Sequence, residues 1–427
     1  MNKLKRHVPE LVLKKIESDD YKLKEHLYII CDMIYRITTI RKEDTDYSNN
    51  YVDIPLYYYT DIITYKPNYY KALHYLLSSG LIECDGHSSK EAGKALGYRF
   101  KDGNISKLIP VEIRKKTLIN RIIENRKKRN NHVNSKYQIY KEYFLNTFKI
   151  DEKAAMDYIN TLFDKKVDVL KIKVPIEDTL EYLKEYEKIT NQFNHLYMGI
   201  NAIKDGQLHF NSNSTNNRID TNLTSLKSEL KQFIISDFDL FQIDIINSQP
   251  FLLSIILNKE KESGIDNNEI KKYTDWTTQG LFYENFKSEY IKTCNKKITR
   301  KKIKKIMFCI FYSKNTSCKK QKAIFKNMFP TISEWIEKQK SEKHNTLAIK
   351  MQKFESAICI DIICKELDLK QIRYYTIHDA WLIGKEDSLV TTKIIEDSFM
   401  KFYNTKPKLS IEPTNNIKFN TTKKAID

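Results

Sequence analysis

Short strand-like runs and longer helical runs alternate in the C-terminal half of the sequence. Residues 240–244 form an apolar run that ends in Asp244, and Gln249-Pro250 then opens a helical run. Farther on, two apolar runs at 372–377 and 380–383 flank His378-Asp379. Because apolar runs joined by a polar pair are typical of a hairpin, we expect Asp379 at its tip. The pattern therefore predicts two strand ends, each carrying an aspartate.

The N-terminal part has a helical pattern followed by two short apolar runs. Helices are predicted over Glu25–Ile40 and Tyr69–Leu77, with a further helical stretch between them after a proline-marked loop. Strands are predicted at Gly80–Cys84 and Tyr98–Phe100, joined by a polar loop. Three helices and a hairpin with a basic loop resemble the winged-helix module of plasmid and phage replication proteins. The alternative is a small α+β domain that only packs against the rest of the chain.

Residues 108–185 have a helical and strongly charged pattern. A run of four consecutive cations stands out within it: Arg126, Lys127, Lys128 and Arg129. Such a run usually marks a solvated helix face. It is also suited to lining a nucleic-acid duplex, because each cation near a phosphate adds salt-dependent affinity.

The overall charge of the chain indicates a class of binding partner. The 427 residues contain 73 Lys and Arg against 55 Asp and Glu, a net charge of +18. A field of this sign attracts polyanions, so nucleic acid is the leading partner. A Lys-rich composition inherited from an AT-rich genome explains the charge equally well, and the motifs have to decide between the two.

The cysteines and the apolar runs exclude several other classes of protein. The seven cysteines include no CxxC pair, and the histidines are not grouped with them, so the sequence predicts neither a zinc site nor a disulfide framework. The longest apolar runs, such as Phe251–Leu257, are far too short for a membrane span. We therefore expect a soluble cytoplasmic protein with no membrane partner.

One helical segment between the two aspartates carries a regular stripe of four residues. Arg300, Lys304, Phe308 and Tyr312 recur every four positions and so share one helix face. Two cations can neutralise a triphosphate, and two aromatic rings can stack against a base and a sugar. An ordinary amphipathic helix with a basic outer face is the alternative interpretation.

The two aspartates suggest a metal-dependent reaction. Carboxylates at neighbouring strand ends can hold two Mg²⁺ ions about 3.5–4 Å apart, with Mn²⁺ as a substitute. Such a pair activates a hydroxyl nucleophile and stabilises the leaving group. Asp244 and Asp379 are therefore the candidate metal ligands and catalytic residues.

The three segments, in this order, resemble motifs A, B and C of the superfamily that joins family A DNA polymerases to single-subunit phage-type RNA polymerases. The match of Arg300, Lys304, Phe308 and Tyr312 to the fingers helix is the most specific part, and His378-Asp379 matches the palm hairpin. The resemblance implies catalytic roles for Arg300, Lys304, Tyr312 and His378 beside the aspartates. It also implies nucleotide contacts for Phe308, Gln249, Lys304 and Arg300.

Two flanking segments extend the resemblance over residues 205–412. Arg218 matches an arginine that contacts the primer and template in that superfamily. On a helix before the third motif, either Gln352 or Glu355 matches a polar residue near the template base, and the sequence does not choose between them. Ser313 and Ala380 depart from the family pattern, where glycine and, in DNA polymerases, glutamate are usual.

The resemblance implies an α+β right-hand polymerase, with an antiparallel palm sheet and helical fingers. The expected organisation is a winged-helix-like domain at 1–105, a basic helical thumb or linker at 106–204, and the palm and fingers at 205–427. The N-terminal half lacks the spaced acids of a proofreading exonuclease.

Two residues give opposing indications of whether the enzyme would join ribonucleotides or deoxyribonucleotides. Gln249 stands where family A DNA polymerases place a glutamate that excludes ribonucleotides, which favours RNA synthesis, whereas Phe308 is closer to the DNA polymerase pattern. A DNA-dependent RNA polymerase or primase is favoured, with a DNA polymerase as the alternative. A basic α/β nuclease does not account for the stripe, and a catalytically inactive replication initiator does not account for the retained acids. The expected partners are a DNA template, nucleoside triphosphates and an accessory protein for initiation, and a phage, plasmid or other mobile element is the expected source.

Overall fold

The computed structural model describes residues 4–19, 21–40, 51–63, 66–89, 94–131, 137–174, 179–260 and 264–414. It divides into two compact units. The described residues of the first unit fall in Met1–Asn211 and Asp220–Ile235, and those of the second in Ser212–Ile219 and Ser236–Lys418. The ranges expected as separate domains at 1–105 and 106–204 both lie in the first unit.

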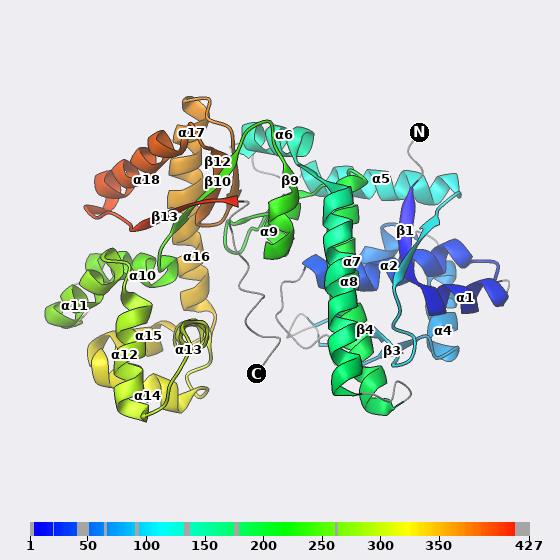
Figure 1. Ribbon diagram of the computed structural model, residues 1–427, viewed down its shortest axis with the longest axis horizontal. Helices are drawn as coiled ribbons and strands as arrows, with labels where there is room; N and C mark the ends of the chain where they lie inside the picture. The colour runs from blue at the N-terminus through cyan, green and yellow to red at the C-terminus, as the bar shows by residue number, and fades with distance from the viewer. Residues whose placement is uncertain are drawn as a thin grey trace. The chain divides into compact units, whose positions relative to one another are not determined.

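The first unit combines helices with three small sheets (Figure 1). Its helices are α1 (Glu10–Ser18), α2 (Lys24–Ile40), α3 (Leu56–Thr60), α4 (Lys66–Ser78), α5 (Lys116–Asn131), α6 (Gln138–Thr147), α7 (Glu152–Lys173), α8 (Leu180–Lys204), α9 (Asn222–Ser225) and the 3₁₀ helix η2 (Ser228–Phe233). Its strands are β1 (Lys5–Pro9), β2 (Val52–Asp53), β3 (Ile82–Cys84), β4 (Gly97–Phe100), β5 (Leu108–Glu112), β6 (Lys149–Ile150) and β9 (Ile234–Ile235). They pair as β1-β5, β2-β4-β3 and β6-β9.

The predicted helices and hairpin near the N-terminus are confirmed as elements. α2, α3 and α4 precede the antiparallel pair β3–β4, and β2 adds a third strand on the other side of β4. The prediction for residues 108–185 was wrong at its start, because Leu108–Glu112 is strand β5 rather than helix. This strand pairs along its whole length with β1, a partner a hundred residues away that a local pattern does not reveal.

A buried ion cluster holds β1 against α2. The backbone N–H of His7 donates to the Asp32 carboxylate at 3.0 Å, and Arg36 donates to the same carboxylate at 2.9 Å. Burial acts to raise the pKa of Asp32, but Arg36 and Arg6 outweigh it and hold that pKa well below its usual range. Because a buried charge without partners is costly, this cluster ties the strand to the helix.

The second unit has a four-stranded antiparallel sheet and a group of helices. Its strands are β10 (Leu240–Ile245), β11 (Tyr374–Ile377), β12 (Ala380–Gly384) and β13 (Leu409–Pro413), in the order β11-β12-β10-β13. Its helices are α10 (Ser248–Lys259), α11 (Asn267–Thr278), α12 (Phe282–Cys294), α13 (Arg300–Tyr312), α14 (Lys319–Met328), α15 (Pro330–Gln339), α16 (Thr346–Ile358), α17 (Lys365–Leu369) and α18 (Ser388–Tyr403). A further two-stranded sheet pairs β7 (Phe210–Ser212) with β8 (Ile219–Thr221), and most residues of both strands belong to the first unit. The expected mixed α+β class is confirmed.

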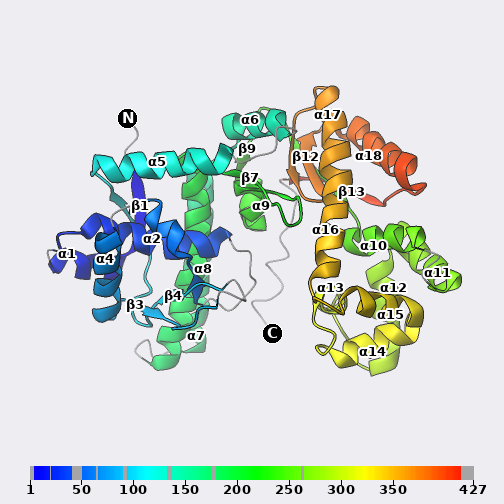
Figure 2. The same cartoon turned by 180° about the vertical axis from the view of Figure 1, so that it is seen from behind.

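One long helical segment organises the second unit. α16 continues through the π-helical turn η4 (Cys359–Cys364) into α17 without a break. Figures 1 and 2 show it as a single column whose C-terminal part lies beside the sheet. Helices α10 to α16 share a core of buried aromatic and aliphatic side chains, among them Tyr273, Phe282, Phe325 and Met351. The column therefore connects the sheet to the helical core.

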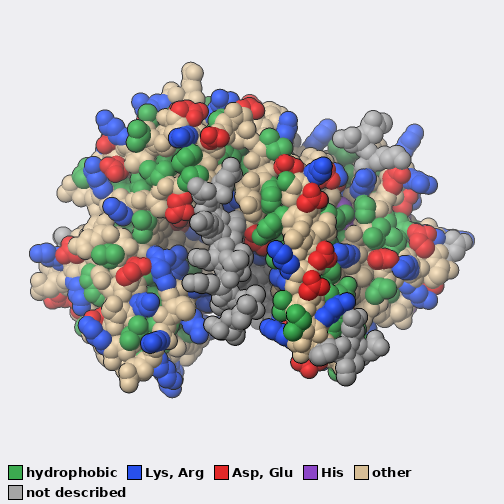
Figure 3. Space-filling model, in the orientation of Figure 1, with side chains coloured by type: hydrophobic (Ala, Val, Ile, Leu, Met, Phe, Trp, Pro, Cys, Tyr) green, Lys and Arg blue, Asp and Glu red, His purple; other side chains and the backbone are tan. Residues whose placement is uncertain are grey.

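Cationic side chains mark part of the surface of this unit. Figure 3 shows Lys and Arg side chains gathered over the region formed by α12 to α14. The sequence of α13 begins with Arg300-Lys-Lys-Ile-Lys-Lys, and that of α14 begins with Lys319-Lys320. Across the ranges that the structure describes, no helix is both long enough and apolar enough to cross a membrane.

Candidate active site

Asp244 and Asp379 lie next to each other on neighbouring strands of the sheet. Asp244 pairs in register with Ala380, the residue that follows Asp379. The backbone N–H of Ile245 donates to the Asp379 carbonyl oxygen at 3.4 Å, which places the two aspartates at the same end of the strand pair. Both residues are half-buried. The backbone therefore brings the two acids together, and their role as metal ligands stays a prediction.

Local sequence explains why both aspartates lie at the edge of a buried sheet. Ile243 and Ile245 flank Asp244 and are buried, so the alternation of a strand turns the aspartate to the other face. The strands β11 and β12 are buried along their whole length, and His378 adopts a left-handed conformation with φ of 59°. This conformation allows a two-residue turn, which the structure forms at His378-Asp379 as predicted.

The stripe helix forms as expected and presents its polar face away from the core. Thr299 caps α13 by accepting a hydrogen bond from the Lys302 N–H at 3.3 Å. Ile303, Met307, Ile310 and Phe311 are buried in the helical core. Of the stripe, Arg300, Lys304 and Phe308 are exposed, whereas Tyr312 is half-buried and packs against this core.

Lys304 is electrostatically linked to both aspartates. Partial removal from water, followed by the charge of Arg300, lowers the pKa of Lys304, while Asp244 and Asp379 act in the opposite direction. The ammonium also lies 5.5 Å from the centre of the Tyr283 ring, a cation–π contact. The structure thus brings a cation of the stripe within range of the carboxylate pair.

Arg300 is held differently from Lys304. Its Nε donates to the Glu284 carboxylate at 2.6 Å, and its guanidinium lies 5.3 Å from the centre of the Tyr283 ring. Both partners come from α12, and sequence reasoning did not identify either of them. Because the Arg300–Glu284 pair is nearly half exposed, it contributes little to stability.

Gln249, Tyr312 and Phe308 form a connected group at the end of α13. The Tyr312 hydroxyl donates to the side-chain oxygen of Gln249, which lies at the start of α10. The Phe308 ring stacks on the Tyr312 ring with centroids 5.9 Å apart, and 46% of Phe308 is exposed. The residue expected near the sugar and the two aromatic residues of the stripe are therefore neighbours.

Glu355 and Arg218 complete this group from two further segments. Glu355 lies on α16 and is fully buried, and its carboxylate accepts two hydrogen bonds from Arg218 at 2.9 Å. It also accepts one from the Gln249 amide at 2.7 Å. Burial, and then the charge of Asp379, raises the pKa of Glu355 to about 7 against the opposing effect of Arg218.

The same contacts distinguish the two candidates on α16. The buried Glu355 carboxylate accepts hydrogen bonds from Arg218 and Gln249. Gln352 is half-buried, and its side-chain oxygen accepts a hydrogen bond from Asn216 at 3.1 Å. Of the two, Gln352 is the one with access to solvent. Its role beside a template base, and that of Arg218 beside a primer, stay predictions.

The four consecutive cations belong to α5 in the first unit. Lys127 and Lys128 are exposed, whereas Arg126 is partly buried and lies 3.4 Å from the Gly206 carbonyl oxygen. The side chain of Arg129 lies outside the described residues. Lys127 and Lys128 are thus accessible to a polyanion, and their predicted contact with nucleic acid stays a prediction.

The prediction that the cysteines form no disulfide was wrong. Cys309 on α13 and Cys318 at the start of α14 form a disulfide, with Cα atoms 6.5 Å apart. The two are nine positions apart in the sequence, and the turn between the helices brings them together. The spacing carries no motif, so only the packing of α13 and α14 reveals the pair.

The residues fit a divalent metal bound together with a substrate. Mg²⁺ is commonly held by one or two carboxylates, with phosphate oxygens and water completing its shell. Asp244 and Asp379 supply two such carboxylates beside a cationic helix face. In the part of the chain that the structure describes, no group of three or more His, Cys, Asp or Glu side chains could hold a metal by itself.

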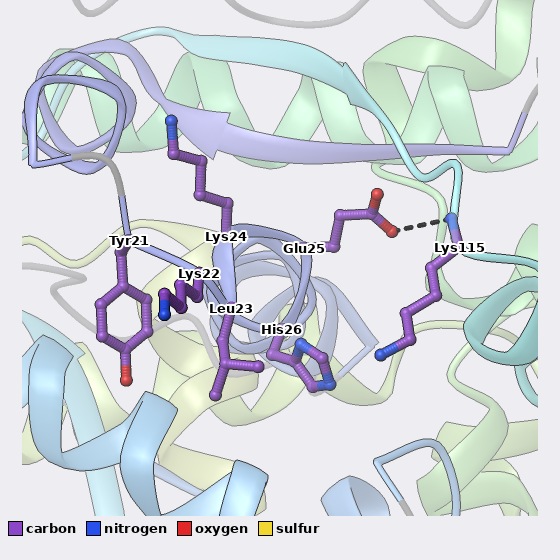
Figure 4. Close-up of a pocket in the computed structure, with 7 residues that line it drawn as sticks. All are labelled: Tyr21, Lys22, Leu23, Lys24, Glu25, His26 and Lys115. Carbon is purple, nitrogen blue, oxygen red and sulfur yellow. Dashed lines mark hydrogen bonds between the residues drawn. The ribbon is translucent and has the colours of Figure 1, made fainter.

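A pocket of about 350 Å³ lies in the first unit. It is lined by Tyr21 to Leu23, by the first turn of α2 and by Lys115, and Figure 4 shows the end of the Lys115 side chain near the His26 ring. The Glu25 carboxylate accepts a hydrogen bond from the Lys115 backbone N–H at 3.0 Å. The pocket contains none of the residues predicted for catalysis.

Comparisons with known proteins show a similarity to solved structures but no match to a family. No family model matches the sequence, and no curated protein matches it. Among solved structures, the chain is similar to the POL domain of Pol1 from M. smegmatis, described in complex with DNA primer-template and dNTP. The similarity has a TM-score of 0.46 and 9% sequence identity, over 70% of this chain and 73% of that chain. At these values it carries nothing about chemistry, so the support for a function comes from the residues of this chain.

Proposed function

We propose that this chain is a template-directed nucleotidyltransferase that joins ribonucleotides on a DNA template. The observation that carries the proposal is that Asp244 and Asp379 lie together on adjacent strands, and that both act to raise the pKa of Lys304 on α13. Paired carboxylates of this kind, opposite a cation, are suited to holding metal ions and a triphosphate together. The expected cofactor is Mg²⁺, with Mn²⁺ as a substitute.

Each residue of the site has a role in this proposal. Metal ions bound to Asp244 and Asp379 supply activation of a 3′-hydroxyl and stabilisation of pyrophosphate. Lys304 and Arg300 bind the triphosphate, and Arg300 leaves Glu284 to do so. Phe308 offers an exposed ring to the incoming base.

The first unit has the proposed role of holding the template. Exposed Lys127 and Lys128 contact the phosphate backbone, which gives affinity without sequence preference. The winged-helix-like arrangement of α2, α3, α4 and the β3–β4 hairpin is a second proposed nucleic-acid surface. An accessory protein for initiation remains part of the proposal without a residue assigned to it.

DNA synthesis is the second candidate function. The stacking of Phe308 on Tyr312 favours it, because an aromatic residue at this stripe position resembles the DNA polymerase pattern. The neutral amide of Gln249 in contact with Tyr312 favours ribonucleotides instead, because it removes the acidic group that excludes them in that pattern. We give the Gln249 amide more weight than the Phe308 ring, because Gln249 has the position expected beside the sugar.

Incorporation of labelled nucleotides tests the proposal. We expect the protein to extend chains with rNTPs on a DNA template in the presence of Mg²⁺, in reactions run with and without a primer on DNA and RNA templates. Asp244→Ala and Asp379→Ala should each abolish incorporation while leaving nucleic-acid binding within about twofold, because the template is gripped by Lys and Arg.

Asp239→Ala is the matched control for these variants. Asp239 is exposed and directly precedes β10, the strand whose far end carries Asp244. It should retain full incorporation. An active Asp244→Ala/Asp379→Ala double variant would refute the metal assignment, and a wild-type protein that binds DNA but incorporates nothing would support an inactive initiator instead.

A further inference from the structure

A disulfide closes the short connection between α13 and α14. Cys309 lies in the last turn of α13, and Cys318 directly precedes α14. Both residues are half-buried, whereas the free cysteines Cys359 and Cys364 are buried. Since part of each residue reaches the surface, a small molecule can approach this disulfide in the folded protein.

The sequence around the disulfide is strongly cationic. Residues 300–333 include ten Lys and Arg and no Asp or Glu. Lys319 and Lys320 are exposed and directly follow Cys318, which is the N-cap residue of α14. Neighbouring cations and a helix N-terminus both favour the thiolate form of a cysteine, and a sulfur that is stable as a thiolate leaves readily in thiol–disulfide exchange. Cys318 is therefore suited to being the leaving group when an external thiolate attacks the disulfide.

The other cysteine belongs to the part of α13 that carries the aromatic residues of the stripe. Cys309 directly follows Phe308, whose ring stacks on Tyr312. Its carbonyl oxygen accepts hydrogen bonds from the Ser313 backbone N–H at 3.1 Å and from the Ser313 hydroxyl at 2.6 Å. The covalent bond to Cys318 thus restrains the same end of the helix that presents the two rings.

Two buried lysines hold the connection independently of the sulfur atoms. The Lys340 ammonium donates to the carbonyl oxygens of Ile310 at 2.7 Å and Ser313 at 3.2 Å. Lys322 on α14 donates to the Lys314 carbonyl oxygen. Because these hydrogen bonds do not involve either cysteine, opening the disulfide loosens the connection without taking the two helices apart.

We propose that Cys309 and Cys318 form a redox-active pair, which low-molecular-weight thiols open and a low-molecular-weight disulfide closes, and that the closed form holds Phe308 and Tyr312 in the arrangement that binds a nucleotide. The exchange itself does not depend on the proposed function, whereas its effect on nucleotide binding rests on it.

The exchange takes place in two steps. The thiolate of one small thiol attacks the Cys309 sulfur, the bond between Cys309 and Cys318 breaks, and Cys318 leaves as a thiolate. A second thiol then attacks the sulfur of the first, which releases the Cys309 thiolate and a disulfide of the two small thiols. Two electrons pass to the protein in this way, and the two protons of the small thiols end on the two cysteines.

Glutathione buffers of varied composition test the exchange in the folded protein. After incubation, acid stops the reaction, and alkylation followed by mass spectrometry of peptides shows whether Cys309 and Cys318 are bonded or free. We expect the pair to open in reduced glutathione and to close again in oxidised glutathione. A pair that stays bonded until the protein is unfolded, or that is free at every ratio, refutes the proposal.

Lys319→Gln/Lys320→Gln tests the role of the cationic surroundings. With the neutral thiol 2-mercaptoethanol as the probe, the rate of disulfide opening should fall about threefold, because the Cys318 thiolate becomes a poorer leaving group. Lys370→Gln/Lys393→Gln removes the same charge from exposed positions elsewhere in the unit and should leave the rate unchanged. Equal rates for both double variants would refute the assignment of Cys318 as the leaving group.

Nucleotide incorporation by the oxidised and the reduced protein tests the effect on the site. Reduction should raise KM for the nucleotide about threefold, with less change in kcat, because only a fraction of the opened molecules keep the end of α13 in the binding arrangement. Cys318→Ser should have the higher KM and show no response to reductant, whereas Cys294→Ser should respond like the wild type.

The outcomes separate the exchange from the proposed function. An equal KM in both redox states, in a protein whose disulfide does open, refutes the link to nucleotide binding. A protein that exchanges thiols but incorporates nothing in either state refutes the proposed nucleotidyltransferase function and supports the redox-active pair.

Discussion

Lys304 differs from the neighbouring lysines of α13 in the charges that surround it. Partial removal from water, and then the charge of Arg300, lowers the pKa of Lys304, whereas Asp244 and Asp379 act to raise it. A triphosphate bound beside the aspartates would meet the Lys304 ammonium before the other lysines of the helix. Because charge builds up on the phosphate in the transition state, such a cation acts mainly on the rate of the chemical step.

Lys304→Ala should therefore reduce the single-turnover rate of incorporation by about tenfold to hundredfold, with a smaller effect on nucleotide affinity. Rapid-quench measurements over a range of nucleotide concentrations separate the two quantities. Lys302→Ala is the control, since Lys302 is exposed and two positions away on the helix, on a different face. Equal losses for both variants would contradict a specific role of Lys304.

At the scale of elements, the column formed by α16, η4 and α17 holds the site through Glu355. Burial first, and then Asp379, raises the pKa of Glu355 from 4.5 to about 7, while Arg218 and Gln249 lower it. Burial, and then the charge of Glu355, raises the pKa of the nearby Tyr312 hydroxyl. As the pH rises, this carboxyl group loses its proton at a lower pH in the unfolded chain than in the folded protein. Between these two pKa values, ionisation of Glu355 therefore favours the unfolded chain.

The free energy of unfolding should consequently fall as the pH rises from 5 to 8, relative to that of Glu355→Gln. The shift from 4.5 to about 7 predicts a relative change of about 2 to 3 kcal/mol. Urea unfolding of metal-free protein measures it, and tryptophan fluorescence reports on the second unit alone because all three tryptophans, Trp276, Trp335 and Trp381, lie there. Parallel pH profiles for the wild type and Glu355→Gln would show that the carboxyl group does not titrate in this window.

The disulfide between α13 and α14 affects the same unit. Closing a loop of this length stabilises a folded state by about 2 to 3 kcal/mol through the unfolded chain. Reductant should lower the free energy of unfolding of the second unit by this amount in the wild type and in Cys294→Ser. Cys309→Ser should start at the lower value and show no response to reductant, and a wild type that is equally insensitive would contradict the disulfide.

For the whole molecule, the net charge of +18 predicts a salt-dependent grip on nucleic acid. If Lys127 and Lys128 each contact a phosphate, Lys127→Gln/Lys128→Gln should reduce the slope of log K against log salt by about two. Fluorescence anisotropy with an unrelated duplex measures this slope. Lys165→Gln/Lys173→Gln on α7 removes the same charge from other exposed positions and should leave the slope nearly unchanged.

Several elements of the second unit could be predicted from the sequence, because the patterns that indicate them are short. A strand that ends in Asp244, a hairpin with His378-Asp379 at its turn and a helix from Arg300 to Tyr312 each depend on spacing within about a dozen residues. The pairing of β1 with β5 joins segments a hundred residues apart, and no local pattern indicates it. The predicted helical start at residue 108 failed for this reason.

The sequence by itself determined which residue types are the candidates for the proposed chemistry: two aspartates, a stripe of two cations and two aromatic residues, and a glutamine where the DNA polymerase motif that it resembles has a glutamate. Only the tertiary structure decided how these residues act on one another. Glu355 orients Gln249 because α10 and α16 pack together, and Arg300 rests on Glu284 because α12 packs beside α13. Hydrogen bonds form only at close range and charge effects weaken with distance, so both depend on distances that only packing sets.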